Sequence, residues 1–222
     1  MRCLCQILIL FICSCIFFAS TIGQTDSLTS AEVIFTLDFP ASQPEHYSIR
    51  IPSDGLAHYK SDGRLSADSD VTDDFDLDFA LTPETRRRIF ELSAKAGYFQ
   101  KDIDSHKNVA FSGRKTLAYR DAKRSGTETY NYSPNPAVQE LTTLMQNLSA
   151  TLEFGHRLEY DRHYQKLALD DELKRMEDLA RSNELPEVAA IQPILNEIVA
   201  DQAVINVTRA RAQRLLERAG LH

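Results

Sequence analysis

Apolar and polar residues alternate in several short runs in the first half of the chain. In the run 74–81, Phe75, Leu77 and Phe79 form an apolar face, and aspartates occupy the positions between them. A period of two is typical of a strand with one buried face and one face in water. Similar patterns predict further strands at 32–39, 47–51, 56–60, 115–120 and 127–132. We therefore expect an antiparallel sheet.

A helical period interrupts the strands after residue 81. Thr82 suits an N-cap and Pro83 the first helical position, and Gly97 suits the end of this helix. From Asn135-Pro136 onward the chain is almost entirely helical in pattern, with apolar residues at steps of three and four. Further helices are expected at about 186–200 and 202–219.

One continuous helix over 136–181 would be longer than about 65 Å. We therefore expect a break or a bend near Gly155 or at Leu169-Asp170, where Asp170 could cap a new helix. Glycine inside a helix costs about 1 kcal/mol relative to alanine. Close backbone packing or a kink would explain Gly155 better than catalysis would.

These patterns predict an α+β fold in which an N-terminal antiparallel sheet packs with helices and an all-α C-terminal segment follows. The expected boundaries are 1–23 for a signal peptide, 24–155 for the antiparallel α+β domain and 156–222 for the helical segment. The first half of the long helix should cover the sheet, and its second half should contact the C-terminal helices.

The first 23 residues have the features of a secretory signal peptide. Arg2 precedes an apolar run, and small or polar residues follow it up to an expected cleavage between Gly23 and Gln24. All four cysteines lie in this leader, so the mature chain would have no thiol for catalysis, metal binding or disulfides. Export to the periplasm or the medium is expected. The alternative is an uncleaved membrane anchor, although the run is shorter than the roughly 20 apolar residues that spanning requires.

The mature chain is acidic. Loss of Arg2 with the leader changes the formal charge from −7 to −8. This balance argues against nucleic acid and against anionic membrane surfaces as partners. Membrane association is expected only through an uncleaved leader. Phosphate-binding loops, Gly-x-Ser-x-Gly and His-Glu-x-x-His motifs are absent from the sequence, and no cofactor is expected.

A candidate metal site comprises His156, Glu159 and His163, which lie on one face of the predicted long helix. His156 and His163 would be about 10 Å apart along the helix axis, so another element would have to supply further ligands. A metal-dependent hydrolase is the corresponding alternative function. The competing interpretation is a solvated helix face.

Two charged clusters are weaker candidates. The aspartates in 68–78 could bind calcium, but an EF-hand starting at Asp68 fails because Asp73 and Phe79 occupy its glycine and glutamate positions. The competing interpretation is an acidic loop followed by the wet face of a strand. Arg86-Arg87-Arg88 could bind an anion, but a helix surface is favoured.

Two resemblances add to this picture. LEFGHRLEY (152–160), YQKLALD (164–170), INV (205–207) and RARAQRLL (209–216) resemble segments of exported proteins from soil bacteria of the acidobacterial type. That resemblance implies no activity and no site. The segment that begins LPEV, 185–216, is similar to one HEAT-type helical pair, which would imply a packing unit or a protein-binding surface.

The sequence therefore predicts a non-enzymatic exported protein that serves as a protein-binding or structural module. Another protein is the expected partner, contacted through the C-terminal helices, and the oligomeric state stays open. The alternatives are the metal-dependent hydrolase with His156, Glu159 and His163, and a membrane-tethered subunit with an uncleaved leader.

Overall fold

The computed structural model describes residues 30–40, 42–63 and 72–221. The predicted signal peptide with its cleavage site at Gly23 and Gln24 lies outside these residues, and so do Asp68 and Asp70 of the acidic cluster. Among the described residues, no helix is both long enough and apolar enough to cross a membrane.

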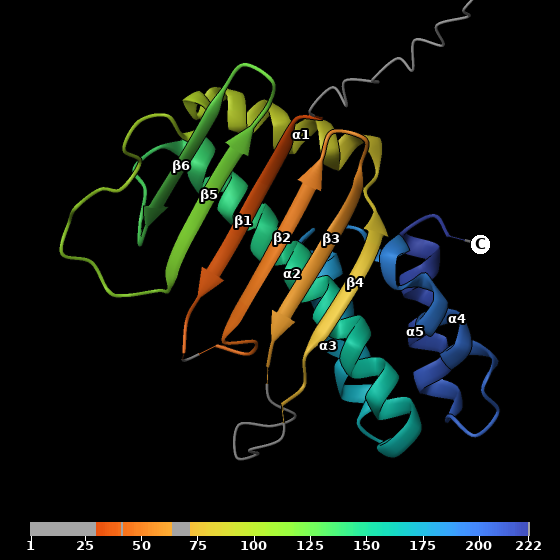
Figure 1. Cartoon of the computed structure of the whole chain (residues 1–222). Coiled ribbons are helices and arrows are strands. Elements are labelled where there is room, and N and C mark those ends of the chain that lie inside the picture. Colours follow the sequence, from red (N-terminus) through yellow and green to blue (C-terminus); the bar gives the residue numbers. More distant parts are fainter. Residues whose placement is uncertain (1–29, 41, 64–71, 222) are drawn as a thin grey trace, which may run out of the picture.

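Six antiparallel strands form one sheet in the order β4-β3-β2-β1-β5-β6 (Figure 1). Consecutive strands pair from β1 to β4, after which helix α1 carries the chain back so that β5 pairs with β1. The strands are β1 (Glu32–Asp38), β2 (His46–Pro52), β3 (Leu56–Asp62), β4 (Phe75–Ala80), β5 (Arg114–Arg120) and β6 (Ser125–Tyr130). The α+β class with an antiparallel sheet is thus confirmed.

The last strand lies two residues earlier than the predicted 127–132. Asn131 and Tyr132 form hydrogen bonds with the preceding loop. The Asn131 N–H donates to the Asp104 carboxylate, and the Ser105 N–H donates to the Tyr132 carbonyl. The ladder with β5 therefore ends at Tyr130. These loop contacts join residues more than 25 positions apart, and a period-two pattern carries no signal for them.

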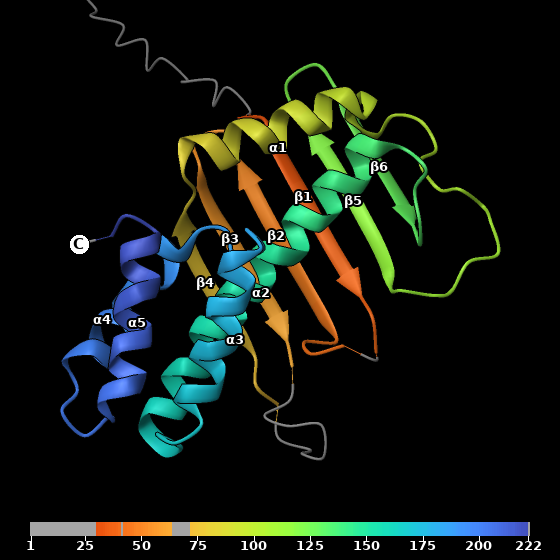
Figure 2. The ribbon, with the colours of Figure 1, turned by 180° about the vertical axis from the view of Figure 1, so that it is seen from behind.

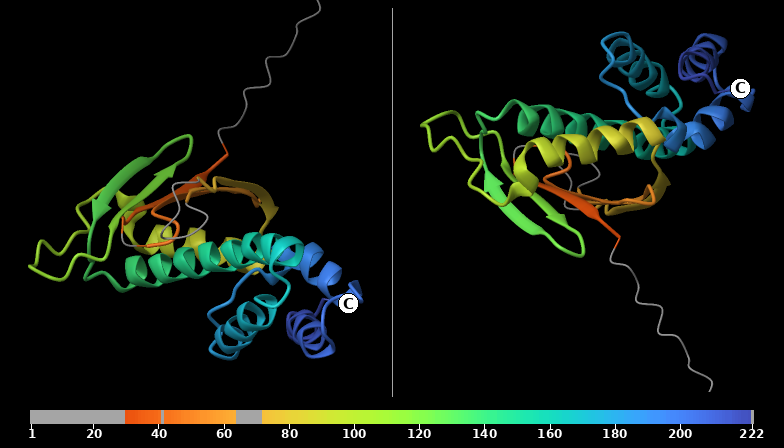
Figure 3. Two further views of the ribbon diagram at one scale, coloured as in Figure 1. Left: turned by 90° about the horizontal axis from the view of Figure 1, so that it is seen from below. Right: turned by 90° about the horizontal axis from the view of Figure 1, so that it is seen from above.

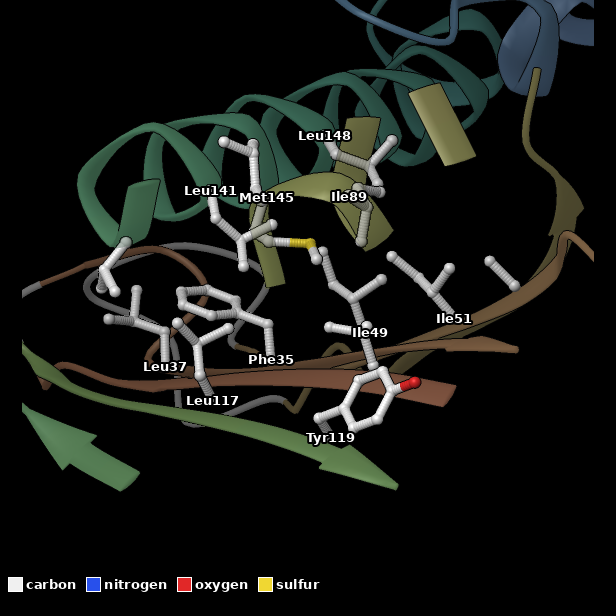
Figure 4. Close-up of a cluster of buried hydrophobic side chains, with 14 of the residues drawn as sticks. Phe35, Leu37, Ile49, Ile51, Ile89, Leu117, Tyr119, Leu141, Met145 and Leu148 are labelled. Atoms are coloured by element: carbon white, nitrogen blue, oxygen red, sulfur yellow. The ribbon is translucent and has the colours of Figure 1, made fainter. Parts of the chain in front are cut away.

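Helices cover only one face of the sheet (Figures 2 and 3). They are α1 (Pro83–Lys95) and the first half of α2 (Pro136–Tyr164). Apolar side chains from the inner face of the sheet meet Leu141, Met145 and Leu148 of α2 in the first core (Figure 4). Of the helices in the described residues, none covers the opposite face, which carries the polar positions of the alternating pattern.

Helix α1 begins where its capping residues predict. The Thr82 side chain accepts a hydrogen bond from the Thr85 N–H, and Pro83 is the first helical residue. The helix ends at Lys95, and Gly97 follows with φ = +71° in the short 3₁₀ helix η1 (Gly97–Phe99). Both expectations for this helix are confirmed.

Helix α2 runs through Gly155 without interruption, so the break is not at this one of the two expected positions. The break lies between Tyr164 and α3 (Leu169–Arg181), which agrees with the other expected position. Asp170 does not cap α3, because Ala168 is the N-cap residue and makes no side-chain cap bond. Asp170 instead accepts hydrogen bonds from Thr208 and Arg211. Tertiary partners thus outcompete the local capping role of this aspartate.

The C-terminal part comprises the 3₁₀ helix η2 (Val188–Ile191), α4 (Gln192–Ala200) and α5 (Asn206–Arg218). Pro193 lies in the first turn of α4, where its missing N–H costs no hydrogen bond. Helix α5 begins four residues later than predicted, because the Asp201 carboxylate holds a turn by accepting the Ala203 N–H. This region forms a helical pair, and its likeness to a HEAT pair stays a prediction.

A second apolar core lies between the C-terminal half of α2 and helices α3 to α5. The inward side chains of α2 belong to the first core up to Leu152 and to the second core from Phe154 onward. Helix α2 therefore connects the two cores, as expected from its length. The side chains of α2 pass from the first core to the second next to the predicted domain boundary at 155. The division into domains stays a prediction.

Candidate functional site

The three residues of the predicted metal site make separate contacts. His156 Nε2 lies 2.9 Å from Asp73 Oδ1, and the ring stacks on Phe75 with 4.4 Å between ring centroids. His163 Nδ1 lies 2.8 Å from the backbone carbonyl oxygen of Glu159, one turn earlier in the same helix. The carboxylate of Glu159 has no part in that contact. Each imidazole thus engages a different neighbour.

In the part of the chain that the structure describes, no three His, Cys, Asp or Glu side chains lie close enough together to hold a metal ion. The helix-borne set His156, Glu159 and His163 would need ligands from elsewhere, as its spacing already indicates. A hydrolase built on it stays an untested prediction.

A buried carboxylate lies one turn before His156. Glu153 Oε1 accepts hydrogen bonds from the Tyr59 hydroxyl at 2.6 Å and from the Ser61 hydroxyl at 2.8 Å. Ser149 also bonds to Tyr59. Burial and the nearby Glu153 raise the pKa of Tyr59 well above its ordinary value, so the phenol is neutral and serves as a donor. This network joins α2 to β3.

The Ser61 hydroxyl in this network is paired with a carboxylate and not with a histidine. A catalytic serine needs a base within hydrogen-bonding reach, commonly a histidine. Ser61 donates to Glu153, whereas His156 pairs with Asp73. The polar groups here satisfy one another, as buried polar groups must for stability.

The described aspartates of the acidic stretch point in different directions. Asp73 contacts His156 on the helix side of the sheet, while His58 Nδ1 lies 2.8 Å from Asp78 and 3.6 Å from Asp76 on the open face. For these three aspartates the structure agrees with the interpretation as a loop followed by the wet face of a strand. Calcium binding by the stretch as a whole stays a prediction, since Asp68 and Asp70 are outside the described residues.

The arginine triplet lies at the surface of α1. Arg86 donates to the carbonyl of Asp54 at 2.7 Å, and Arg88 forms an ion pair with Glu140 of α2. Arg87 pairs with Glu91 one turn later. Arg86 and Arg88 therefore connect α1 to its neighbours and Arg87 pairs within α1, in agreement with the favoured helix-surface interpretation.

A different surface carries large apolar side chains that are exposed to solvent. Four large apolar side chains are exposed where the α2–α3 turn and the α4–α5 loop meet: Tyr164 (76% exposed), Leu167 (85%), Ile205 (54%) and Val207 (50%). Both connections lie at the same end of the helices in Figure 1. We call these four residues the helical tip.

One ion pair joins the two connections, and a second joins helices α2 and α4 next to them. Lys166 Nζ lies 2.8 Å from Asp201 Oδ2, and Arg162 pairs with Glu197 at 2.9 Å. The hydrogen bond from Lys166 keeps the pKa of Asp201 below its ordinary value, so this carboxylate is charged at neutral pH. The two connections at the helical tip are therefore joined to each other by one charged pair, Lys166–Asp201, and the adjoining helices α2 and α4 by another.

The tip residues are exposed because other residues occupy the inward positions of their helices. Val204 and Thr208 are buried on either side of Ile205 and Val207, and Leu169 is buried just after Leu167. Exposed apolar side chains of this size add no buried apolar surface to the second core. Their presence is therefore not explained by folding.

Both helices that begin at this end lack a capping side chain. Ala168 is the N-cap of α3 and Ile205 is the N-cap of α5, and neither makes a side-chain cap bond. Ser, Thr, Asp or Asn at an N-cap is better than an aliphatic residue by about 1 kcal/mol. Residues at functional sites commonly differ from the residue type that is most stable locally. The N-caps of α3 and α5, Ala168 and Ile205, both differ in this way.

Sequence reasoning did not single out the helical tip. It named the C-terminal helices as the partner-binding region without naming residues. The available signal was the position of Ile205 and Val207 outside the apolar stripe of the last helix, together with Leu167 at a helix break. That signal is weak without the fold, because scattered surface hydrophobics are common. No protein-family model matches the chain, and no curated protein sequence matches it.

Proposed function

We propose that this protein is an exported, non-enzymatic binding module that holds a partner protein through its helical tip. The observation that carries the proposal is that Tyr164, Leu167, Ile205 and Val207 are all at least half exposed and border two connections, the α2–α3 turn and the α4–α5 loop, which the Lys166–Asp201 ion pair joins. Apolar and aromatic side chains are typical of the centre of a protein interface, where charged side chains are rare.

The surroundings of the tip suit a protein partner. Lys166 and Asp201 flank it as a charged pair, and Glu159 and Asp171 are exposed nearby on α2 and α3. An apolar centre with a polar rim is the common anatomy of a protein interface. Acidic side chains at the rim and the acidic mature chain disfavour an anionic lipid surface. The occupant we propose is an apolar patch on another protein.

Tyr164 and Leu167 are the expected anchors. Aromatic side chains are enriched among residues that dominate binding energy, and Leu167 is the most exposed large apolar residue described. The neighbouring Tyr160 ring, 5.0 Å from that of Tyr164 between centroids, supports the exposed phenol from behind. Preorganised aromatic anchors lose little conformational freedom on binding.

A site-specific photo-crosslinking experiment in the native host tests the proposal. A photoreactive amino acid replaces Leu167 or Val207 in the full-length chain, and Leu56 serves as the matched control because it is equally apolar, 60% exposed and located on β3. We expect one discrete protein adduct from Leu167 and from Val207 and none of that mass from Leu56. The adduct should be lost when Tyr164→Ser is combined with the probe at Val207.

Three kinds of crosslink, and the absence of any crosslink, would contradict the proposal. The three kinds are an adduct of the same mass from Leu56, an adduct with twice the mass of this chain, and crosslinking to lipid alone. The second would make the tip a contact between copies, and the third would make it a membrane contact. Absence of any adduct from both tip positions would also overturn it.

A further inference from the structure

A pocket of about 170 Å³ lies at the opposite end of the sheet from the helical tip, where β5 begins, β6 ends and α2 begins. Its wall is rich in hydroxyl and amide groups. The lining residues are Ser112, Lys115, Tyr130, Asn131, Tyr132, Ser133, Gln139, Thr142 and Thr143. Most of these groups can donate a hydrogen bond.

Lys115 occupies a position in this pocket where the strand pattern calls for an apolar residue. It alternates with Thr116 so that it shares the inner face of β5 with Leu117 and Tyr119, and all three are buried. Lysine is almost never fully buried unless it is paired. Lys115 therefore departs from the apolar pattern of its neighbours on the inner face of β5, Leu117 and Tyr119.

No carboxylate in the described part of the chain pairs with this ammonium group. Its Nζ atom donates instead to uncharged oxygens at 2.9 to 3.2 Å: the carbonyls of Ser112, Gly113 and Asn131 and the Ser112 hydroxyl. These contacts satisfy its hydrogen-bonding groups but leave its positive charge uncompensated. Burial of an uncompensated charge is unfavourable, so an anion beside it would be stabilised.

The start of α2 adds positive potential at the same place. Gln139, Thr142 and Thr143 line the pocket from the first two turns of this 29-residue helix, whose first turn contains no acidic residue. The N-terminal end of a helix favours a negative charge nearby. The buried ammonium group and the helix end therefore act in the same direction.

We propose that this pocket binds a small anion, the carboxylate or phosphate group of a small molecule, with Lys115 as the charged anchor. The hydroxyl of Thr143 orients the rest of the molecule, because both amide hydrogens of Gln139 are already donated, to the Tyr132 hydroxyl and the Ser133 carbonyl. A volume of about 170 Å³ is below the range of drug-sized ligands and admits only a small one. The proposed site is far from the helical tip and does not depend on the function assigned to the tip.

Two-dimensional NMR titration of the full mature chain tests this site with sodium phosphate and, separately, sodium acetate as probes, at constant ionic strength adjusted with sodium chloride. We expect at least one probe to cause saturable shifts at the amides of Gln139, Thr142 and Thr143. The preferred probe then distinguishes a phosphate ligand from a carboxylate ligand.

Three variants make the test decisive. Lys115→Met keeps the length of the side chain and removes its charge, and it should weaken binding at least tenfold. Thr143→Val removes one lining hydroxyl with little change of shape, and it should weaken binding several-fold. Lys60→Met removes an exposed lysine from the outer face of β3 and should leave binding unchanged.

The proposal is overturned if neither probe gives saturable shifts, or if Lys60→Met weakens binding as much as Lys115→Met does. Should Lys115→Met fail to fold, Thr143→Val decides alone, and unchanged affinity in that variant overturns the site.

Discussion

Gly155 shows why a single residue can contradict its local preference. A Cβ atom at this position would lie less than 3.0 Å from Ile191 Cγ2 of η2. The missing side chain lets η2 approach the backbone of α2, so the glycine allows close packing without a kink. Close backbone packing was one of the two explanations expected from the sequence, and it is the correct one.

We predict that Gly155→Ala destabilises the protein by about 1–3 kcal/mol, although alanine is the better helix former. The added methyl group must displace Ile191 or push η2 away from α2. Urea denaturation measures the change in the free energy of unfolding. In an Ile191→Ala background the same substitution should cost much less, and an equal cost in both backgrounds would contradict the steric explanation.

Asp161 is a buried carboxyl group between α2 and α3. Burial raises its pKa above the ordinary value, Glu172 of α3 adds to this effect, and Arg157 of α2 opposes it. Because the folded state binds this proton more tightly than the unfolded state, the contribution of Asp161 to stability falls as pH rises above about 4, its ordinary pKa.

We predict that Asp161→Asn becomes more stable relative to the natural protein as pH increases from about 4 to 7. Urea midpoints measured over this range provide the comparison, with Asp171→Asn as the control because Asp171 is exposed on α3. A stability difference for Asp161→Asn that is independent of pH would contradict the assignment.

At the scale of elements, the start of α1 depends on a residue more than 100 positions away. Glu187 Oε2 accepts the Thr82 N–H at 3.0 Å, and its Oε1 accepts the Thr82 hydroxyl at 2.7 Å. A carboxylate at the N-terminal end of a helix is also favoured by the helix dipole. Glu187, just before η2, thus connects the C-terminal helices to the first helix.

We predict that Glu187→Gln lowers the free energy of unfolding by about 1–3 kcal/mol, because an amide cannot accept both hydrogen bonds and loses the charge. Glu184→Gln is the matched control, since Glu184 is an exposed glutamate three residues earlier. Equal effects of the two substitutions on the urea midpoint would show that the contact with Thr82 contributes nothing.

At the scale of the whole molecule, α2 is the element common to both cores. Its 29 residues extend over about 43 Å. Leu148 packs in the first core and Leu158 in the second, and both are completely buried. Disruption of either core should therefore affect the helix along its length.

We predict that the two cores unfold together. Leu195→Ala in the second core should lower stability by about 2–5 kcal/mol and should reduce hydrogen-exchange protection in β1 and β2 as well as in α4. Leu148→Ala should likewise reduce protection in α4. Loss of protection confined to the core that carries the substitution would contradict this prediction and would indicate two independently unfolding units.

The sequence by itself determined the class of the fold and most element boundaries. Alternation and helical periodicity reflect which side of each segment is buried, and Thr82, Pro83 and Gly97 act through their immediate neighbours. Such local signals also gave the break before Leu169. They failed at Asp170 and could not choose between close packing and a kink at Gly155, because distant residues decide the outcome at both positions.

Only the tertiary structure decided how distant side chains combine. The pairing of His156 with Asp73, the contact of Glu187 with Thr82, and the junction of the two loops at the helical tip each join segments 35 or more residues apart. The physical reason is that periodicity reports burial along one segment, whereas a site depends on which segments the packed cores bring together.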